Sequence, residues 1–331
     1  MLETMALATA DTLQEDYRAM REGCGLFDRS ERGKLALTGA GAREFLNGQV
    51  TNELLTLRPG EGCYAALLTH KGKMLADLRI LAIGGSAGQE PAELLLDTER
   101  VALQALFDTI RRHKVGFAVE LHKRTVERGL LSLLGPQAAQ VAGAERLPAA
   151  EHANEALSID GVPALAVRTD AGVDLLCDAA DTPALAAALR ARGAREVSEQ
   201  AVEILRVESG RPRYGVDIDD GVIPQEAGLN ERAVSFTKGC YVGQETVARL
   251  FYRGRPNRHL RGLRLSAPAA PGVELELDGR PVGRLGSSVV SPRLGPIALA
   301  LVRREAAPGA LLRVGGEGVT GTLAELPFAS G

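Results

Sequence analysis

Residues 238–245 read KGCYVGQE, a stretch in which two glycines enclose a thiol and a phenol. Glycine allows a positive φ angle and a close approach of the backbone to a neighbouring group. Lys238 lies two residues before Cys240, and a nearby cation favours the thiolate form of a cysteine. The stretch therefore indicates either a reactive thiol at Cys240 or, as for most lone cysteines, a small hydrophobic side chain that packs in the interior.

The composition is that of an ordinary globular protein. The chain has 331 residues, of which 45% are hydrophobic and 24% are charged, and its net charge is -3. This length is typical of two or three domains. A slightly negative chain has no global basic field to attract nucleic acid, so we expect no direct nucleic-acid binding.

The four cysteines are far apart, no C-x-x-C pair occurs, and the five histidines are scattered. This spacing fits neither a local zinc or cluster site nor a disulfide-dense secreted domain. No run of 18 apolar residues is long enough to span a membrane, and the first residues lack the basic-then-apolar order of a signal peptide. We therefore expect a cytoplasmic protein with no metal site and no membrane contact.

The pattern of the chain changes near residue 258. Before it, strand-like runs alternate with helical spacing: 63–69 and 74–80 read as a hairpin, and 98–112, 183–192 and 197–209 read as helices. After it, short apolar runs alternate with Gly and Pro turns, which is typical of a small sandwich or barrel. The sequence predicts an α+β fold, with residues 1–255 forming two interleaved subdomains and residues 258–331 a small β-barrel domain.

The stretch 238–245 resembles the K-G-C-[FY]-x-G-Q-E signature of the YgfZ family of folate-binding proteins. That family is related to the T protein of the glycine cleavage system, an aminomethyltransferase. The resemblance covers nearly the whole chain and includes RAMREGCGLFD at 18–28, FLNGQVTN at 45–52 and the barrel segment 282–302. It implies an aminomethyltransferase-like folate-binding fold and tetrahydrofolate, or a one-carbon derivative, as the cofactor.

The resemblance implies a pterin anchor at Glu208, within the R-x-E-x-G stretch 206–210. A carboxylate can accept two N–H groups of the pterin edge in bidentate geometry. The alternative is a helix-surface glutamate paired with an arginine, since lone charges are usually solvated. Tyr241 either stacks on a ring or fills the core. The resemblance also leads us to expect Lys238 and Gln244 of the signature among the cofactor-binding residues.

Arg249 belongs to a segment, 249–261, that holds five arginines. These guanidinium groups either meet the glutamate tail of a folate or an acidic partner, or they form a solvated linker into the barrel.

Asp77 occupies the place of an aspartate in the G-G-x-x-D-D stretch of aminomethyltransferases. A carboxylate there stabilises cationic character in one-carbon transfer; the alternative is a residue at a strand end. This chain keeps only one acid of the pair, because Ala76 stands at the other position. Aminomethyltransferases also lack the signature cysteine, so both departures weaken a role in glycine cleavage.

Three functions compete. The YgfZ resemblance implies an accessory protein for iron–sulfur cluster assembly or repair, with Cys240 as the working thiol. Its partners would be iron–sulfur client proteins, and it would support tRNA modification only indirectly. The alternative is an enzyme, a tetrahydrofolate-dependent aminomethyl or methyl transferase that uses Asp77. The third is a folate-binding module without chemistry, in which Cys240 only packs.

Overall fold

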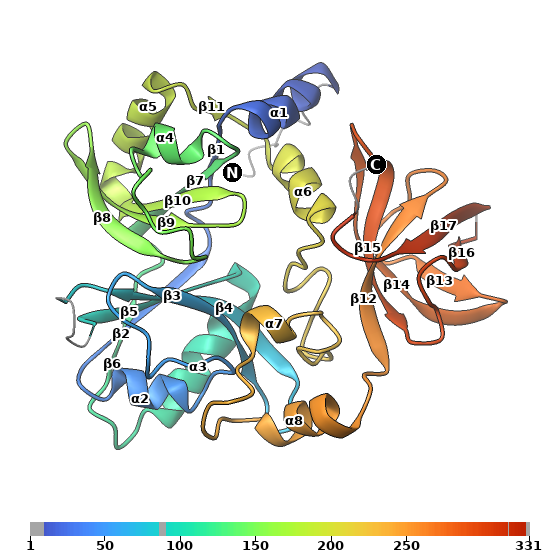
Figure 1. Cartoon of the computed structure of the whole chain (residues 1–331), viewed down its shortest axis with the longest axis horizontal. Helices are drawn as coiled ribbons and strands as arrows, with labels where there is room; N and C mark the ends of the chain where they lie inside the picture. Colours follow the sequence, from blue (N-terminus) through green and yellow to red (C-terminus); the bar gives the residue numbers. More distant parts are fainter. Residues whose placement is uncertain (1–9, 86–90, 317, 329–331) are drawn as a thin grey trace.

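The computed structural model describes residues 10–85, 91–316 and 318–328. Two β-sheets lie one above the other, and a closed barrel stands beside them (Figure 1). Helices α1 (Ala10–Glu22) and α6 (Glu199–Glu208) lie between the sheets and the barrel. The α+β fold with a C-terminal barrel predicted from the sequence is confirmed.

One sheet carries the main hydrophobic core. Its strand order is β3-β4-β5-β2-β6, and leucine side chains of these strands pack against the helices of this half of the molecule. The predicted hairpin is confirmed, because β3 and β4 pair antiparallel with Ala66 opposite Asp77. The bounds are β2 Gly33–Thr38, β3 Gly62–Leu68, β4 Met74–Ile83, β5 Glu93–Thr98, β6 Glu120–Lys123, α2 Ala42–Asn47, the 3₁₀ turn Arg100–Ala102 and α3 Leu103–His113.

The other sheet has the strand order β11-β1-β7-β10-β9-β8 and its own core. The pairing of β1 with β11 is parallel, whereas the neighbouring pairs are antiparallel. The strands β1 and β2 follow each other in the chain but belong to different sheets, so the two layers are interleaved. The bounds are β1 Gly25–Asp28, β7 Arg128–Leu134, β8 Asn154–Ile159, β9 Val162–Arg168, β10 Gly172–Asp178, β11 Arg195–Glu196, α4 Ala138–Ala142, the 3₁₀ turn Ala179–Asp181 and α5 Thr182–Ala191.

A buried ion-pair network joins the two sheets. Arg79 of β4 donates to Asp97 of β5 at 2.7 Å and to Asp174 of β10 at 2.6 Å. Removing one partner from such a network would leave an uncompensated buried charge, which is strongly destabilising. The network therefore holds the two layers in one arrangement and fixes the space between them.

The last part of the chain forms a short helix, α7 (Asn230–Ala233), a longer one, α8 (Gln244–Arg253), and the barrel. The strand pattern of the sequence was compatible with either a sandwich or a barrel. The structure has a closed barrel with the strand order β12-β15-β14-β13-β16-β17 and an apolar interior. No helix of the described ranges is long and apolar enough to cross a membrane. The strand bounds are β12 Arg258–Leu265, β13 Glu274–Leu277, β14 Arg280–Ser291, β15 Gly295–Arg303, β16 Leu311–Val314 and β17 Val319–Ala324.

Candidate functional site

The signature lysine is buried and its ammonium group points into the protein. Lys238 Nζ donates to the backbone carbonyls of Asn47 at 2.7 Å, Val50 at 2.9 Å and Asn52 at 2.6 Å. Burial lowers the pKa of Lys238 to about 8. Because these carbonyls occupy all three N–H donors of an ammonium group, Lys238 anchors the signature loop onto the turn 47–52.

Cys240 lies at the exposed tip of the same loop. Its thiol is free and exposed, and the space around Gly239 is open. The loop closes at Gly243, whose φ is 84°; a Cβ atom there would come within 2.6 Å of the carbonyl oxygen of Thr69. Close packing on the β3–β4 turn thus requires glycine at position 243. Cys240 does not occupy the interior position that was one of its two alternatives.

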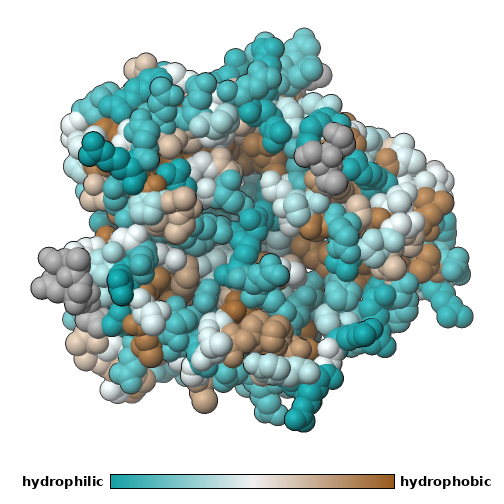
Figure 2. Space-filling model, viewed as in Figure 1, coloured by the Kyte–Doolittle hydropathy of each residue, from teal (hydrophilic) through white to brown (hydrophobic). Residues whose placement is uncertain are grey.

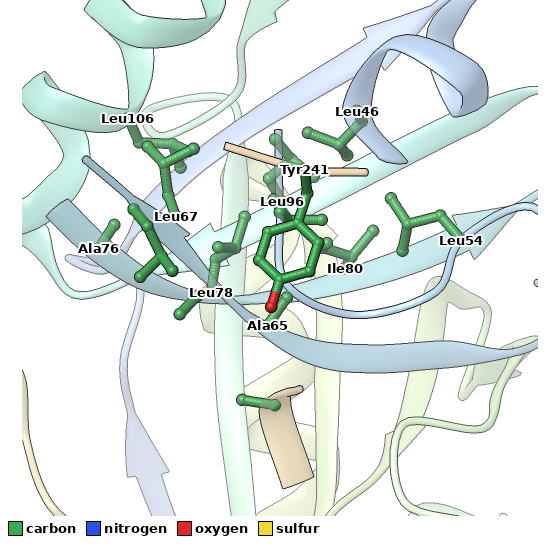
Figure 3. Packing of buried hydrophobic residues seen from close by; sticks show 14 of the residues in the cluster. Leu46, Leu54, Ala65, Leu67, Ala76, Leu78, Ile80, Leu96, Leu106 and Tyr241 are labelled. Carbon is green, nitrogen blue, oxygen red and sulfur yellow. The ribbon is translucent and has the colours of Figure 1, made fainter. Parts of the chain in front are cut away.

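Tyr241 lies in the main core. Its ring packs among apolar side chains of α2, the following turn and the β-sheet, including Leu46, Leu54 and Ile80 (Figure 3). Burial raises the pKa of its hydroxyl to about 12. Of the two roles considered for Tyr241, the structure shows the packing role.

The second half of the signature begins α8, and this helix includes the first residues of the segment 249–261, for which a solvated linker was one of the alternatives. Gln244 is half-buried in its first turn and Arg249 is exposed. The ring of Phe251 stacks on that of Phe236 at 3.7 Å, and Tyr252 contacts Phe251 edge-on at 5.0 Å. Figure 2 shows a hydrophobic patch in the lower part of the molecule, where α8 lies in Figure 1.

Asp77 lines a separate cavity of about 220 Å³ between the sheets and α6. Tyr64 and Asp77 are diagonal neighbours on one face of the β3–β4 hairpin, and the Tyr64 hydroxyl donates to Asp77 Oδ2 at 2.5 Å. Burial raises the pKa of the Asp77 carboxyl above its ordinary value, although the hydrogen bond from Tyr64 and the charge of Arg32 oppose the shift. Asp77 is therefore tuned to take up a proton more readily than an exposed aspartate.

Ion pairs line the rest of this cavity. Arg32 contacts Asp97 at 2.7 Å and also pairs with Glu99, and Arg206 pairs with Glu203 at 2.7 Å. The remaining lining residues include the arginines 29, 211, 213 and 232. The cavity is thus rich in guanidinium groups, with acids interspersed among them.

Two lining residues offer groups that the protein leaves partly unused. Asp170 is exposed to 41% and both N–H contacts from Arg211 converge on its Oδ2 atom at 2.7 Å. Within the described part of the chain, its Oδ1 atom accepts no hydrogen bond. The Nε atom of Arg213 is buried without a hydrogen-bond partner, although Glu99 lies 3.9 Å away. Such groups are available to a ligand.

Glu208 lies outside this cavity. Its carboxylate accepts hydrogen bonds from the Tyr17 hydroxyl of α1 at 3.0 and 3.1 Å and from the Ser291 hydroxyl of the barrel, and Arg293 lies 3.7 Å away. Glu208 is 5% exposed. The carboxylate expected to anchor a pterin thus joins α1, α6 and the barrel in this structure, and it is not a solvated surface glutamate.

The predicted site residues therefore occupy three places. Lys238, Cys240, Tyr241, Gln244 and Arg249 belong to the signature loop and α8, Asp77 to the cavity, and Glu208 to the barrel junction. Tyr64, Asp170 and the arginines of the cavity were not predicted from the sequence. Only Tyr64 had a signal, because the predicted hairpin places it on the same face as Asp77. In the described ranges, no three His, Cys, Asp or Glu side chains form a group that fits a metal ion.

Comparison with known proteins identifies the class. Residues 6–238 match the GCVT N-terminal domain, and residues 258–326 match the C-terminal beta-barrel domain of CAF17. The chain therefore belongs to the GCVT family. The barrel match also confirms the predicted resemblance to the YgfZ family. The chain thus has an aminomethyltransferase-like fold together with a barrel domain of the CAF17 type.

Individual relatives support this placement. A putative chloroplastic transferase of Arabidopsis thaliana is 28% identical over 96% of this chain and 74% of its own length. An aminomethyltransferase of Geobacillus kaustophilus is 31% identical over 89% of this chain and 84% of its own length. The crystal structure of the glycine cleavage system aminomethyltransferase T of Bartonella henselae superposes with a TM-score of 0.84 at 25% identity, covering 96% of this chain and 90% of that one.

Proposed function

We propose that this protein binds tetrahydrofolate, or a one-carbon derivative of it, and supports iron–sulfur cluster assembly or repair through Cys240. One observation carries the proposal. The chain holds two different sites, a charged cavity around Asp77 and an exposed thiol on a loop that Lys238 anchors. An accessory protein that senses or uses folate and also acts on a partner needs both a folate-binding cavity and an exposed reactive group.

The cavity has donors and acceptors that suit a pterin. A pterin presents a ring N–H beside an amino group, and a carboxylate that accepts both forms a strong, directional contact. Asp170 is the most open of the acids in the cavity wall, with one oxygen unused by the described residues. We therefore assign the pterin-anchoring role to Asp170 in place of Glu208, whose carboxylate is engaged elsewhere.

The remaining residues would hold other parts of the cofactor. Arginines suit the carboxylates of a folate glutamate tail because each guanidinium binds a carboxylate in bidentate geometry, and Arg213 retains an unpartnered N–H group in the cavity wall. A bound folate supplies a one-carbon unit. If the protein were a transferase, the Tyr64–Asp77 pair, with a carboxyl whose pKa is raised, would hold or move a proton beside that unit.

The surface around Cys240 suits a protein partner. Exposed aromatic side chains are typical of interaction sites, and here Phe251 is 49% and Tyr252 is 67% exposed. Arg249 and Arg253 on the same helix are exposed as well. Iron–sulfur client proteins are the partners we propose for this surface, so the protein would affect tRNA modification only through such enzymes.

The division of the chain and its compartment are part of the same proposal. We assign residues 1–255 to the folate-binding region and residues 258–331 to a barrel domain that joins α6 through the contact of Ser291 with Glu208. The four cysteines are all free thiols, which fits the reducing cytoplasm.

A folate-dependent aminomethyl or methyl transferase is the second candidate. The Tyr64–Asp77 hydrogen bond inside the cavity favours it, as do the relatives that are themselves aminomethyltransferases. Against it stands Ala76, which replaces one acid of the pair found in those enzymes. Fold similarity alone does not assign this activity.

Cells that lack the gene test the two functions against each other. We expect a low activity of an iron–sulfur enzyme that methylthiolates tRNA, restored by the wild-type gene, and unchanged glycine cleavage. Loss of glycine cleavage with a normal iron–sulfur enzyme would instead support the transferase.

A further inference from the structure

A single residue, Asn52, joins the cavity wall to the signature loop. The amide nitrogen of Asn52 donates to the carbonyl oxygen of Tyr64 at 2.9 Å and to that of Arg232 at 3.3 Å. Tyr64 and Arg232 both line the cavity, and the Arg232 guanidinium lies 5.0 Å from the centre of the Tyr64 ring. Asn52 therefore contacts the backbone behind two neighbouring cavity groups that come from different elements.

The other side of Asn52 is attached to the loop that carries Cys240. Its carbonyl oxygen accepts the shortest of the three hydrogen bonds of Lys238, at 2.6 Å. Its side-chain oxygen accepts from the N–H of Glu53 at 2.9 Å, which fixes the orientation of the amide. A displacement of the cavity wall thus reaches the ammonium group of Lys238 through one residue.

The loop itself transmits such a displacement to the thiol. Lys238 holds it at one end, and the Val242 N–H, which donates to the Gly48 carbonyl at 3.2 Å, holds it at the other. Gly48 lies in the same turn, 47–52, that seats Lys238. Between these anchors Cys240 is exposed, and a Cβ atom at Gly239 would meet open space, so a shift of the turn changes the position of Cys240 with little steric resistance.

We propose that Asn52 is a positioning residue that couples occupancy of the cavity to the reactivity of Cys240. A ligand in the cavity contacts the Arg232 and Tyr64 side chains, and Arg232 is also paired with Glu151, in the turn before β8 of the other sheet. Tightening or moving this pair shifts the two carbonyls to which Asn52 donates. The consequence is a difference in the presentation of Cys240 between the free and the folate-bound protein, which is the requirement for coupling between two sites.

The test is the rate at which iodoacetamide alkylates Cys240, followed by peptide mass spectrometry on the full chain with and without saturating 5-formyltetrahydrofolate. This inference rests on folate binding, so folate affinity is measured on the same samples by isothermal titration. In the wild type we expect folate to change the alkylation rate about five-fold, the lower end of typical coupling between sites.

Asn52→Ala should bind folate and lose this response. Asn47→Ala is the matched control, because the Asn47 side chain supports the same turn through the Leu54 N–H at 2.9 Å but forms no hydrogen bond with a cavity residue in the described part of the chain. It should keep the response. Lys238→Met cuts the connection from the loop side and should also abolish the response, which keeps the test available if Asn52→Ala fails to fold.

The outcomes separate the two proposals. No folate binding by the wild type would contradict the proposed function itself. Folate binding without a change in the alkylation rate of Cys240 would overturn the coupling and leave the proposed function standing. An equal response in Asn52→Ala and in the wild type would show that coupling exists but does not pass through Asn52, and this also overturns the inference.

Discussion

Lys238 and Cys240 are two residues apart, yet their side chains occupy opposite environments. The Lys238 ammonium is enclosed by three backbone carbonyls, whereas the Cys240 thiol is exposed at the tip of the loop. The lysine that was expected to activate the thiol is instead the anchor of the loop that presents it. The signature loop is thus held in place at Lys238 and presents an accessible thiol at Cys240.

The first prediction concerns stability. Lys238→Met should lower the free energy of unfolding by roughly 2–4 kcal/mol, because it leaves buried carbonyls without a donor. Cys240→Ser should change it by less than about 0.5 kcal/mol, as is usual for an exposed side chain. Urea denaturation followed by circular dichroism measures both. A Lys238→Met protein as stable as the wild type would contradict the anchoring role.

The second prediction distinguishes two carboxylates. Asp170→Asn should weaken tetrahydrofolate binding by about ten-fold or more, since it removes a charged acceptor that faces the cavity. Glu208→Gln should lower stability with a smaller effect on affinity, because its partners are Tyr17 and Ser291. Isothermal titration and thermal denaturation of the two variants give the comparison, and the opposite pattern would restore Glu208 as the pterin anchor.

The third prediction separates the accessory protein from the transferase. Asp77→Asn removes the titrating group of the cavity but keeps its shape. If the protein acts as an accessory factor, this variant should restore the iron–sulfur enzyme in cells that lack the gene. A transferase would lose turnover by 10²-fold or more, in the range for a positioned acid or base. Failure of Asp77→Asn to restore the iron–sulfur enzyme, with normal folding, would favour chemistry at Asp77.

The fourth prediction is a pH dependence that arises at His152. Burial, together with the charge of Arg79, lowers the pKa of His152 to about 4, and both ring nitrogens are buried without a hydrogen-bond partner. The unfolded chain takes up the proton near pH 6.5. The free energy of unfolding should therefore fall as the pH falls from 6.5 to about 4, by on the order of 3 kcal/mol.

His152→Asn tests this dependence, because asparagine tolerates the positive φ of 69° at this position and does not titrate. Its stability should fall less between pH 7 and pH 4.5 than that of the wild type. His113→Asn, at the exposed end of α3, should behave as the wild type does. Identical pH profiles for His152→Asn and the wild type would assign the acid sensitivity to other groups.

Local patterns predicted much of the fold. The β3–β4 hairpin, α5, α6 and the barrel strands follow from apolar spacing and from glycine and proline turns. The helix α8 was missed because Val247 is its one buried residue. A helix with such a narrow apolar contact and two arginines has the pattern of a solvated linker.

The cavity could not be predicted because its walls come from distant segments. Tyr64, Asp170 and Arg206 meet only after the two sheets and α6 have packed together. Helix rotation explains the placement of Glu208: Arg206 and Glu208 are two residues apart on α6 and so point to different sides. Arg206 lines the cavity, and Glu208 meets the barrel. Of these two residues of the motif, Arg206 is the one on the helix face that lines the cavity.

Complementation with Cys240→Ala tests most directly whether the exposed thiol is required to support iron–sulfur enzymes. Cells that lack the gene receive the wild type, Cys240→Ala or Cys63→Ala, and the activity of an iron–sulfur tRNA-methylthiolating enzyme is measured at matched expression. Cys63 is a suitable control because its thiol is half-buried and burial raises its pKa to about 12. We predict that the wild type and Cys63→Ala restore the activity and that Cys240→Ala does not. Full restoration by Cys240→Ala would contradict a role for the exposed thiol.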